Sequence, residues 1–321
     1  MSRYRLAGLL TFVSIGILTG CSDRSPTNPK PSFLGLPNLP GVPNPPVGAP
    51  PVLSAVAAPG ARAQLKPLVT DAIIPCVGGE TVLLIQDAVP WGFAVPADQD
   101  PLGADVTELK AQDKNFCMIH SADIGTTDLS QFSEILIPSD QTQEYYDNLF
   151  PGFPVGVIHK AIVNWVIQGG VLSANLFDHG SGNFGTWDGK VFVGGVQHIF
   201  APSEITDILD PDHPIIEDDL PCGSNGHCGP IIDAGVQHDL DGWFESNVGY
   251  FTNLCPATKV ILVDELGNPV MIEYGFGAGK VVANVESLEW RYYGAPFGSK
   301  PEKKLLANEI AYQDAIACDG V

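Results

Sequence analysis

Polar and aromatic side chains follow the predicted strands of this 321-residue chain, at the points where the strands end. Carboxylates and amides exchange hydrogen bonds, and tryptophan offers an apolar face, so such a set suits a hydroxyl-rich ligand. In open α/β sheets, ligands bind outside the carboxyl ends of the strands. The candidate ligand-binding residues are Asp87, Trp91, His120, Asp140, Gln141, Asp178, His179, Glu286 and Glu289, with Ser121, Ser139 and Trp290 beside them. The alternative is that strands end in polar residues because the chain turns there.

Asp178, His179 and Glu286 could also form an acid–base set. Hydrolysis of a glycoside uses two carboxyl groups, separated by roughly 5 Å or by roughly 6.5–9.5 Å. The sequence spacing does not fix the distance between Asp178 and Glu286. A carbohydrate-active hydrolase is therefore kept as the alternative to a module that binds without turnover.

The elements that must position these residues alternate between apolar runs of strand length and helical patterns. At residues 132–177, an apolar run, a helical stretch, a Gly-Gly stop and a second apolar run follow one another. This order predicts a βαβ unit, and hence a parallel sheet with helices on its faces. Strands are predicted at residues 81–86, 115–120, 133–138, 171–176, 259–263, 269–274 and 280–285, and helices at 101–112, 145–149, 157–168 and 301–317. The last three strands read as an antiparallel meander that closes the sheet edge.

Residues 177–253 break this pattern and are predicted to form a long, irregular, acidic insertion. Between residues 191 and 258 there is no Lys or Arg, whereas Asp and Glu are frequent. Oxygen-rich loops suit Ca²⁺, which takes six to eight oxygen ligands. Ca²⁺ at residues 207–245 is thus one interpretation and a solvated acidic face is the other; no other cofactor is predicted.

The first residues predict that the protein is located in the bacterial cell envelope. Arg3 and Arg5 precede an apolar stretch at residues 6–18, a pattern typical of a signal sequence. Leu18-Thr19-Gly20-Cys21 follows, and it resembles the lipobox of bacterial lipoproteins. That resemblance implies that Cys21 is acylated, and Ser22 implies sorting to the outer membrane or cell surface. The alternative is an ordinary secretory signal with an incidental cysteine.

Three segments are therefore predicted. Residues 1–20 form the signal peptide, residues 21–64 a Pro-rich tether, and residues 65–321 the folded domain. Proline fixes φ and removes a backbone donor, so the tether is expected to be extended. A formal charge of −21 argues against nucleic acid as a partner, because phosphate backbones would repel it. The expected partners are the membrane, through the lipid, and a small molecule, a glycan or a protein.

Six cysteines follow Cys21, and an exported chain lies where disulfides persist. Cys222 and Cys228 bracket a short Gly-rich loop, which predicts a local disulfide; a zinc site is the alternative for this pair. Two further pairings would follow from the proximity of neighbouring elements, although six cysteines allow 15 connectivities. They are Cys76–Cys117 and Cys255–Cys318.

The order of these motifs resembles class I glutamine amidotransferase-like domains. It runs from DLSQFSEILIPSDQ through a helix to NWVIQGGVLSANL, and then through an acidic excursion and a hairpin to GFGAGKVVANVESLEW. More narrowly, it is similar to the non-catalytic relatives of that family, the trehalose-utilisation-type and β-galactosidase-trimerisation-type modules. The resemblance covers roughly residues 81–317. It implies a flavodoxin-like three-layer α/β/α sandwich with a mostly parallel sheet.

Active members of that family carry a nucleophilic cysteine after a central strand and a His-x-Glu after a late strand. Here the central strand at 171–176 runs into Phe177-Asp178-His179-Gly180, and the late strand runs into Glu286-Ser287-Leu288-Glu289. A catalytic triad needs a nucleophile and a base within hydrogen-bond reach. The departure from the family pattern therefore implies a catalytically inactive module that binds a ligand or has a structural role.

Overall fold

The computed structural model describes residues 73–91, 99–152, 156–176, 187, 189–203, 205–217, 220–231, 247–255, 257–286, 288–292 and 300–318. Only the backbone is described at 290, 291, 300 and 313–318. The predicted signal peptide and tether, Cys21, and the strand-end residues Asp178 and His179 lie outside the described residues.

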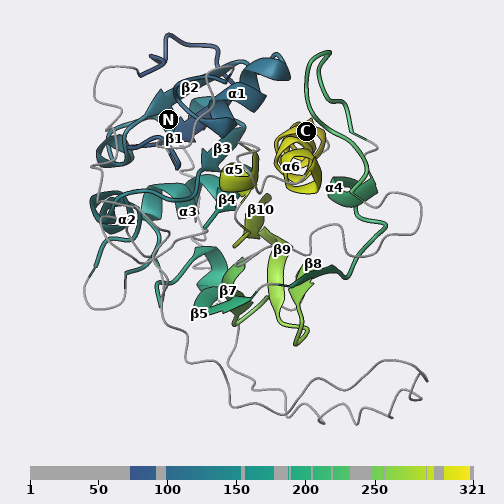
Figure 1. Cartoon of the computed structure of the whole chain (residues 1–321). Coiled ribbons are helices and arrows are strands. Elements are labelled where there is room, and N and C mark those ends of the chain that lie inside the picture. Colours follow the sequence, from purple (N-terminus) through teal and green to yellow (C-terminus); the bar gives the residue numbers. More distant parts are fainter. Residues whose placement is uncertain are drawn as a thin grey trace, which may run out of the picture. The chain divides into compact units, whose positions relative to one another are not determined.

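One eight-stranded sheet, in the order β2-β1-β3-β4-β10-β9-β8-β6, forms the centre of the folded domain (Figure 1). The first five strands of this order are parallel, and the last three continue the sheet with antiparallel pairs. The parallel strands are β1 (Val82–Ile85), β2 (Phe116–Ile119), β3 (Glu134–Ile137), β4 (Val171–Asn175) and β10 (Gly279–Asn284), and the others are β9 (Pro269–Phe276), β8 (Lys259–Asp264) and β6 (Thr206–Ile208). Strands covered on both faces read as unbroken apolar runs, as VLLI of β1 does. The predicted fold class, a mostly parallel α/β sandwich, is confirmed.

Helices cover the sheet in two groups (Figure 1). On one side, α1 (Ala104–Ala111), α5 (Leu288–Tyr292) and α6 (Lys300–Cys318) contact one another, and α6 packs on β3 and β4. On the other side lie α2 (Gln143–Leu149) and α3 (Lys160–Ile167), of which α3 packs against β10. None of the described helices is both long enough and apolar enough to cross a bilayer.

The helix predicted from residue 157 begins instead at Lys160. His159 caps it, because its Nδ1 accepts a hydrogen bond from the backbone N–H of Ala161 at 3.3 Å. Val157 lies outside the helix and forms a bridge with Val191. A side chain that satisfies a free N–H group of the first turn fixes where a helix starts.

The prediction of an irregular insertion at 177–253 is wrong for much of the described part. β5 (Gln197–Ser203) and β7 (Asn247–Thr252) form an antiparallel two-stranded sheet, and α4 (Pro214–Glu217) follows β6. β6 pairs with β8 and is therefore the outermost strand, so the meander β8-β9-β10 does not form the edge. β5 contains Pro202, and its partner strand β7 lies far along the chain; both features hide a strand from sequence patterns.

Two of the three predicted disulfides are confirmed, Cys76–Cys117 and Cys222–Cys228. Cys255 pairs with none of these four cysteines, and its Sγ lies 4.0 Å from the carbonyl oxygen of Gly194. The side chain of Cys318 lies outside the described residues. The Cys255–Cys318 pairing therefore stays a prediction.

Gly279, the first residue of β10, offers a test of the packing between the sheet and α3. A Cβ atom at Gly279 would overlap the carbonyl oxygens of Val166 and Gly170, whereas one at the exposed Gly275 would meet only Gly279 O, at 3.9 Å. Gly279→Ala should therefore lower the free energy of unfolding by about 1–3 kcal/mol. Gly275→Ala, on the same hairpin, should change it by less than about 0.5 kcal/mol. Urea unfolding measures both, and equal effects would contradict this packing.

Candidate functional site

The structure brings Asp87 and His120 together at the carboxyl ends of β1 and β2. Asp87 Oδ1 accepts a hydrogen bond from the backbone N–H of Ser121 at 2.7 Å, and Oδ2 accepts one from Ser121 Oγ at 2.6 Å. His120 Nδ1 lies 3.4 Å from Asp87 Oδ1. The serine hydroxyl therefore donates directly to the carboxylate, with no imidazole between them as base. This is not the arrangement of a Ser-His-Asp triad.

Asp140 and Gln141 brace the loop that follows β1 against the loop that follows β3. Gln141 Oε1 accepts from the backbone N–H groups of Asp87 and Ala88 at 3.0 and 2.9 Å, and its Nε2 donates to Ala88 O at 3.0 Å. Asp140 Oδ2 accepts from the backbone N–H of Trp91 at 2.8 Å. Asp140, Gln141 and Trp91 are all buried. The side chains of Asp140 and Gln141 thus hold these loops in place, and none of the three side chains lines an open surface.

Glu289, on α5, is wholly buried and binds residues at the ends of β3 and β4. Its Oε1 accepts from the backbone N–H of Ser139 and its Oε2 from Ser139 Oγ, both at 2.7 Å. Oε2 also accepts from Asn175 Nδ2. Glu286, also buried, is bonded elsewhere: its Oε1 accepts from Thr206 Oγ1 of β6 at 2.7 Å. The two glutamates therefore belong to different hydrogen-bond groups, and the proposed partner of Glu286, Asp178, lies outside the described residues.

Glu289 belongs to a set of three carboxyl groups, which we call the inner carboxyl cluster: Asp105, Glu289 and Glu309. They come from α1, α5 and α6, the helices that contact one another over one face of the sheet, and each is at most 2% exposed. Glu309 accepts from Ser173 Oγ of β4, and its Oε2 accepts from Asn284 Nδ2 of β10 at 2.7 Å. The charged form of a carboxyl is disfavoured where water is excluded, and more so beside another carboxylate.

Burial is the main cause of the pKa shifts in the inner carboxyl cluster. It raises the pKa of Asp105 to about 7, with a further contribution from Glu309. It raises the pKa of Glu309 to about 8, where Ser173 opposes the rise and Glu289 adds to it. The pKa of Glu289 lies well above its ordinary range, through burial and then through Asp105. The cluster therefore holds protons near neutral pH.

Neither Asp105 nor Glu309 was among the residues predicted from the sequence. Asp105 has the sequence context of an ordinary acidic residue in the first turn of a helix. Glu309 did carry a signal, because it lies four residues after Leu305 and three before Tyr312, on the apolar line of α6. Residues at these separations share one face of a helix. A charged residue on an apolar line is a candidate for a buried, functional or strained position.

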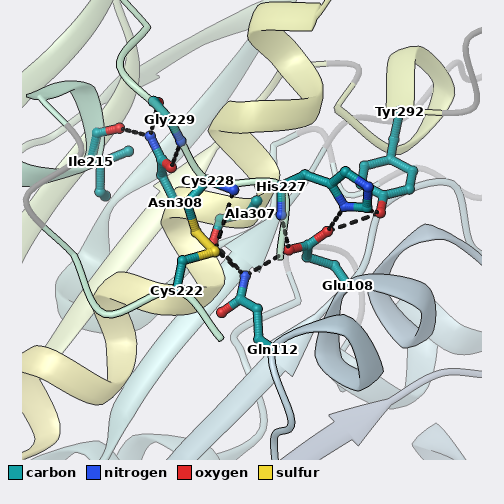
Figure 2. Close-up of a disulfide and its surroundings, with 10 residues drawn as sticks. All are labelled: Glu108, Gln112, Ile215, Cys222, His227, Cys228, Gly229, Tyr292, Ala307 and Asn308. Carbon is teal, nitrogen blue, oxygen red and sulfur yellow. Dashed lines mark hydrogen bonds and ion pairs between the residues drawn. A yellow bond between two sulfur atoms is a disulfide. The ribbon is translucent and has the colours of Figure 1, made fainter. Parts of the chain in front are cut away.

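Glu108, a buried residue of α1, anchors the loop that contains the Cys222–Cys228 disulfide (Figure 2). Its Oε1 accepts from the backbone N–H of His227 at 3.0 Å and from Gln112 Nε2 at 2.8 Å. Its Oε2 lies 2.7 Å from His227 Nδ1 and 2.9 Å from Tyr292 OH. The buried carboxylate is thus satisfied by four donors, as a buried charge must be.

Metal-ligating side chains converge at one place in the described part of the chain. A carboxylate oxygen of Glu108 and the sulfurs of Cys222 and Cys228 all lie within 4.8 Å of one another. In this structure the two sulfurs are bonded to each other and cannot act as thiolate ligands. The described acidic residues of the insertion, Asp207, Asp210, Asp212 and Glu217, belong to no such group. Ca²⁺ at residues 207–245, part of which lies outside the described residues, stays a prediction.

Comparisons with known proteins give distant similarities. No family model matches the chain. Uncharacterized protein CA_P0160 of Clostridium acetobutylicum is 27% identical over 254 residues, which are 78% of this chain and 22% of that protein. The chain thus spans about a fifth of the length of this curated relative.

Solved structures with a related arrangement of elements have low identities. Exo-beta-1,4-mannosidase Op5Man5 from Opitutaceae bacterium strain TAV5 has a TM-score of 0.40 and 14% identity, over 73% of this chain and 36% of that one. A protein described as a GMP synthase subunit from Thermoplasma acidophilum has a TM-score of 0.41 and 8% identity, over 75% and 96%. Cytoplasmic Protein STM3548 from Salmonella typhimurium has a TM-score of 0.39 and 12% identity, over 72% and 98%. Each is a protein to which this chain is similar, and none lends it an activity.

Proposed function

We propose that this protein is a lipid-anchored component of the bacterial cell envelope whose α/β domain holds a ligand or partner without chemical turnover. One observation carries the proposal: the described carboxylates and amides at the strand ends are used in internal hydrogen bonds. Gln141, Asp140 and Glu289 bind backbone and side-chain groups of neighbouring loops, and all three are at most 1% exposed. A catalytic carboxylate must instead reach its substrate.

Asp87 and His120 differ from these residues because their side chains are 15% and 28% exposed. A hydrogen-bonding ligand or a partner protein would reach this pair first. Two disulfides support the extracytoplasmic location, because such bonds persist in oxidising compartments and are rare in reducing ones. Lipid attachment is supported by the sequence around Cys21.

The anchoring half of the proposal is tested by expressing the full chain in a Gram-negative host that is fed a radiolabelled fatty acid. The wild-type protein should incorporate label and sediment with membranes, because Cys21 would carry the acyl chains. Cys21→Ala should lose the label and leave the membrane fraction. Cys255→Ala removes another cysteine and should keep both properties. Label retained in Cys21→Ala would overturn the anchoring.

The non-catalytic half is tested with purified protein lacking the signal sequence, assayed against glutamine and a panel of aryl glycosides and oligosaccharides. No hydrolysis above the blank is expected. A glycosidase activity that Glu286→Gln abolishes, with the fold intact by circular dichroism, would overturn the proposal in favour of a carbohydrate-active hydrolase. Ligand binding is then sought by thermal shift and glycan array, and His120→Ala should weaken any binding at the Asp87–His120 pair.

A further inference from the structure

The loop closed by Cys222 and Cys228 lies beside groups that bind zinc well in proteins (Figure 2). Thiolate sulfur, imidazole nitrogen and carboxylate oxygen are its usual ligands, four at a time in tetrahedral geometry. We propose that this loop is a redox-controlled zinc site. The disulfide closes the site, and reduction opens it to one Zn²⁺ held by Cys222, Cys228, Glu108 and His227.

Three of the four ligand atoms are already gathered. A carboxylate oxygen of Glu108 and both sulfurs lie within 4.8 Å of one another. Zinc–sulfur bonds of about 2.3 Å and zinc–oxygen bonds of about 2.0–2.2 Å place neighbouring ligand atoms roughly 3.5–3.8 Å apart. Once the bond between them is broken, the sulfurs need only move apart to about this distance. Cys222 and Cys228 are six residues apart, and the loop between them, which contains Gly223 and Gly226, takes up this movement.

His227 supplies the fourth ligand. It directly precedes Cys228, and its Nδ1 lies 2.7 Å from Glu108 Oε2. The imidazole is not part of the group within 4.8 Å, so it must turn toward the sulfurs as the loop opens. The His227 side chain is 39% exposed, whereas that of Glu108 is wholly buried. The imidazole side of the loop is therefore the route by which an ion would enter.

The surroundings of Glu108 resemble the outer shell of a zinc site. Gln112 Nε2 donates to Glu108 Oε1 and also to the backbone oxygen of Ala307, both at 2.8 Å. Tyr292 OH lies 2.9 Å from Glu108 Oε2 and 3.2 Å from His227 Nδ1. Such partners orient ligating side chains, and their loss lowers metal affinity by about 10–100-fold. Gln112 Nε2 also lies 3.7 Å from Cys228 Sγ, so this amide stands between the carboxylate and the sulfurs and must turn aside when an ion binds (Figure 2).

The chemistry balances with a dithiol reductant, or with a phosphine and one water, which gives its oxygen to the phosphine oxide and its two protons to the thiols. A dithiol gives two electrons and two protons to the disulfide, becomes a disulfide itself, and leaves two thiols on Cys222 and Cys228. Zinc binding then displaces the two thiol protons to solvent, because thiolate is the ligand. In the oxidised state the same carboxylate is satisfied by its four hydrogen-bond donors, so the protein has two ordered states of one loop.

Cobalt(II) tests the site because its bonds to thiolate give a charge-transfer absorption in the near ultraviolet. Protein reduced with a phosphine, under anaerobic conditions, should show this band at one Co²⁺ per chain, and Zn²⁺ should displace it. The oxidised protein should show no band. Glu108→Gln should weaken Zn²⁺ binding at least about tenfold, measured by competition with a chromophoric chelator.

Two variants separate this site from the other thiols of the chain. Cys222→Ser with Cys228→Ser should abolish the cobalt band. Cys76→Ser with Cys117→Ser, which removes the other disulfide, should leave it intact. A band that survives in the first variant, or no band in reduced wild-type protein that remains folded by circular dichroism, would overturn the proposal.

Discussion

Raising the pH from about 6.5 to 9 should lower the free energy of unfolding by roughly 3 kcal/mol or more, since Asp105 and Glu309 alone account for that amount at about 1.4 kcal/mol per pKa unit. Burial raises the pKa of Asp105 to about 7 and that of Glu309 to about 8, and it holds the pKa of Glu289 well above its ordinary range. The unfolded chain has lost these protons by pH 6.5, whereas the native protein still holds them. Stability is therefore present at lower pH and is lost as the pH rises through the native pKa values.

The pH window avoids groups that act in the opposite sense. Burial lowers the pKa of His198 to about 3, so the unfolded state gains a proton relative to the native state only below the ordinary pKa of histidine, about 6.5. Urea titrations at several pH values measure the slope. Glu309→Gln should flatten it, because the neutral amide needs no proton, whereas Glu144→Gln on the exposed side of α2 should not. A free energy that stays constant or rises across this window would contradict a protonated inner carboxyl cluster.

Replacing Glu273 by alanine should destabilise the domain by about 3–5 kcal/mol, because it removes the carboxylate to which the buried side chains of His213 and Tyr312 are bonded. Glu273 Oε2 lies 2.9 Å from His213 Nε2 and accepts from Tyr312 OH at 2.6 Å, and Oε1 lies 3.3 Å from Lys259 Nζ. Burial alone would raise the pKa of Glu273, but His213, Tyr312 and Lys259 outweigh it and lower the pKa to about 2. Glu273 lies in β9, so these contacts connect β9 to His213, the residue before α4, and to Tyr312 in the middle of α6.

The partners of Glu273 provide the control for that variant. Lys259 is 54% exposed, so Lys259→Ala removes a solvated ion pair and should cost less than about 1 kcal/mol. Glu273→Ala should also remove stability that wild-type protein loses as the pH falls from about 4.5 toward 2, since the lowered pKa contributes only above that range. Thermal or urea unfolding measures both effects. Similar losses in the two variants would contradict a structural role for the buried His213–Glu273–Tyr312 group.

The parallel half of the sheet could be predicted because buried strands appear in the sequence as short, mostly apolar runs. VLLI of β1 and VLSAN of β4 are buried along their whole length, and the Gly-Gly stop after α3 separates helix from strand. β5 and β7 could not be predicted, because neither has a regular alternation of buried and exposed residues and each finds its partner far along the chain. Cross-strand pairing of this kind depends on context more than on local propensity.

The residues of the candidate site could be located but not oriented from the sequence. Parallel topology was enough to place Asp87, Asp140 and Glu289 near one edge of the sheet. Whether a carboxylate faces a ligand or a backbone N–H depends on the conformation of the loop. Asp140 is an example: its φ is +53°, and its side chain accepts a hydrogen bond from the backbone N–H of Trp91. Asp105 was missed because burial of an acidic residue depends on helices that arrive later in the chain, α5 and α6.

The position of β10 between β4 and β9 has a consequence for synthesis of the protein. β4 lies between β3 and β10, and β10 is made near the end of the chain. During translation, β4 therefore presents a row of open N–H and C=O groups on an apolar strand. Such an edge templates aggregation with other chains. Nascent or truncated chains that end before Gly279 would thus need a chaperone to stay apart.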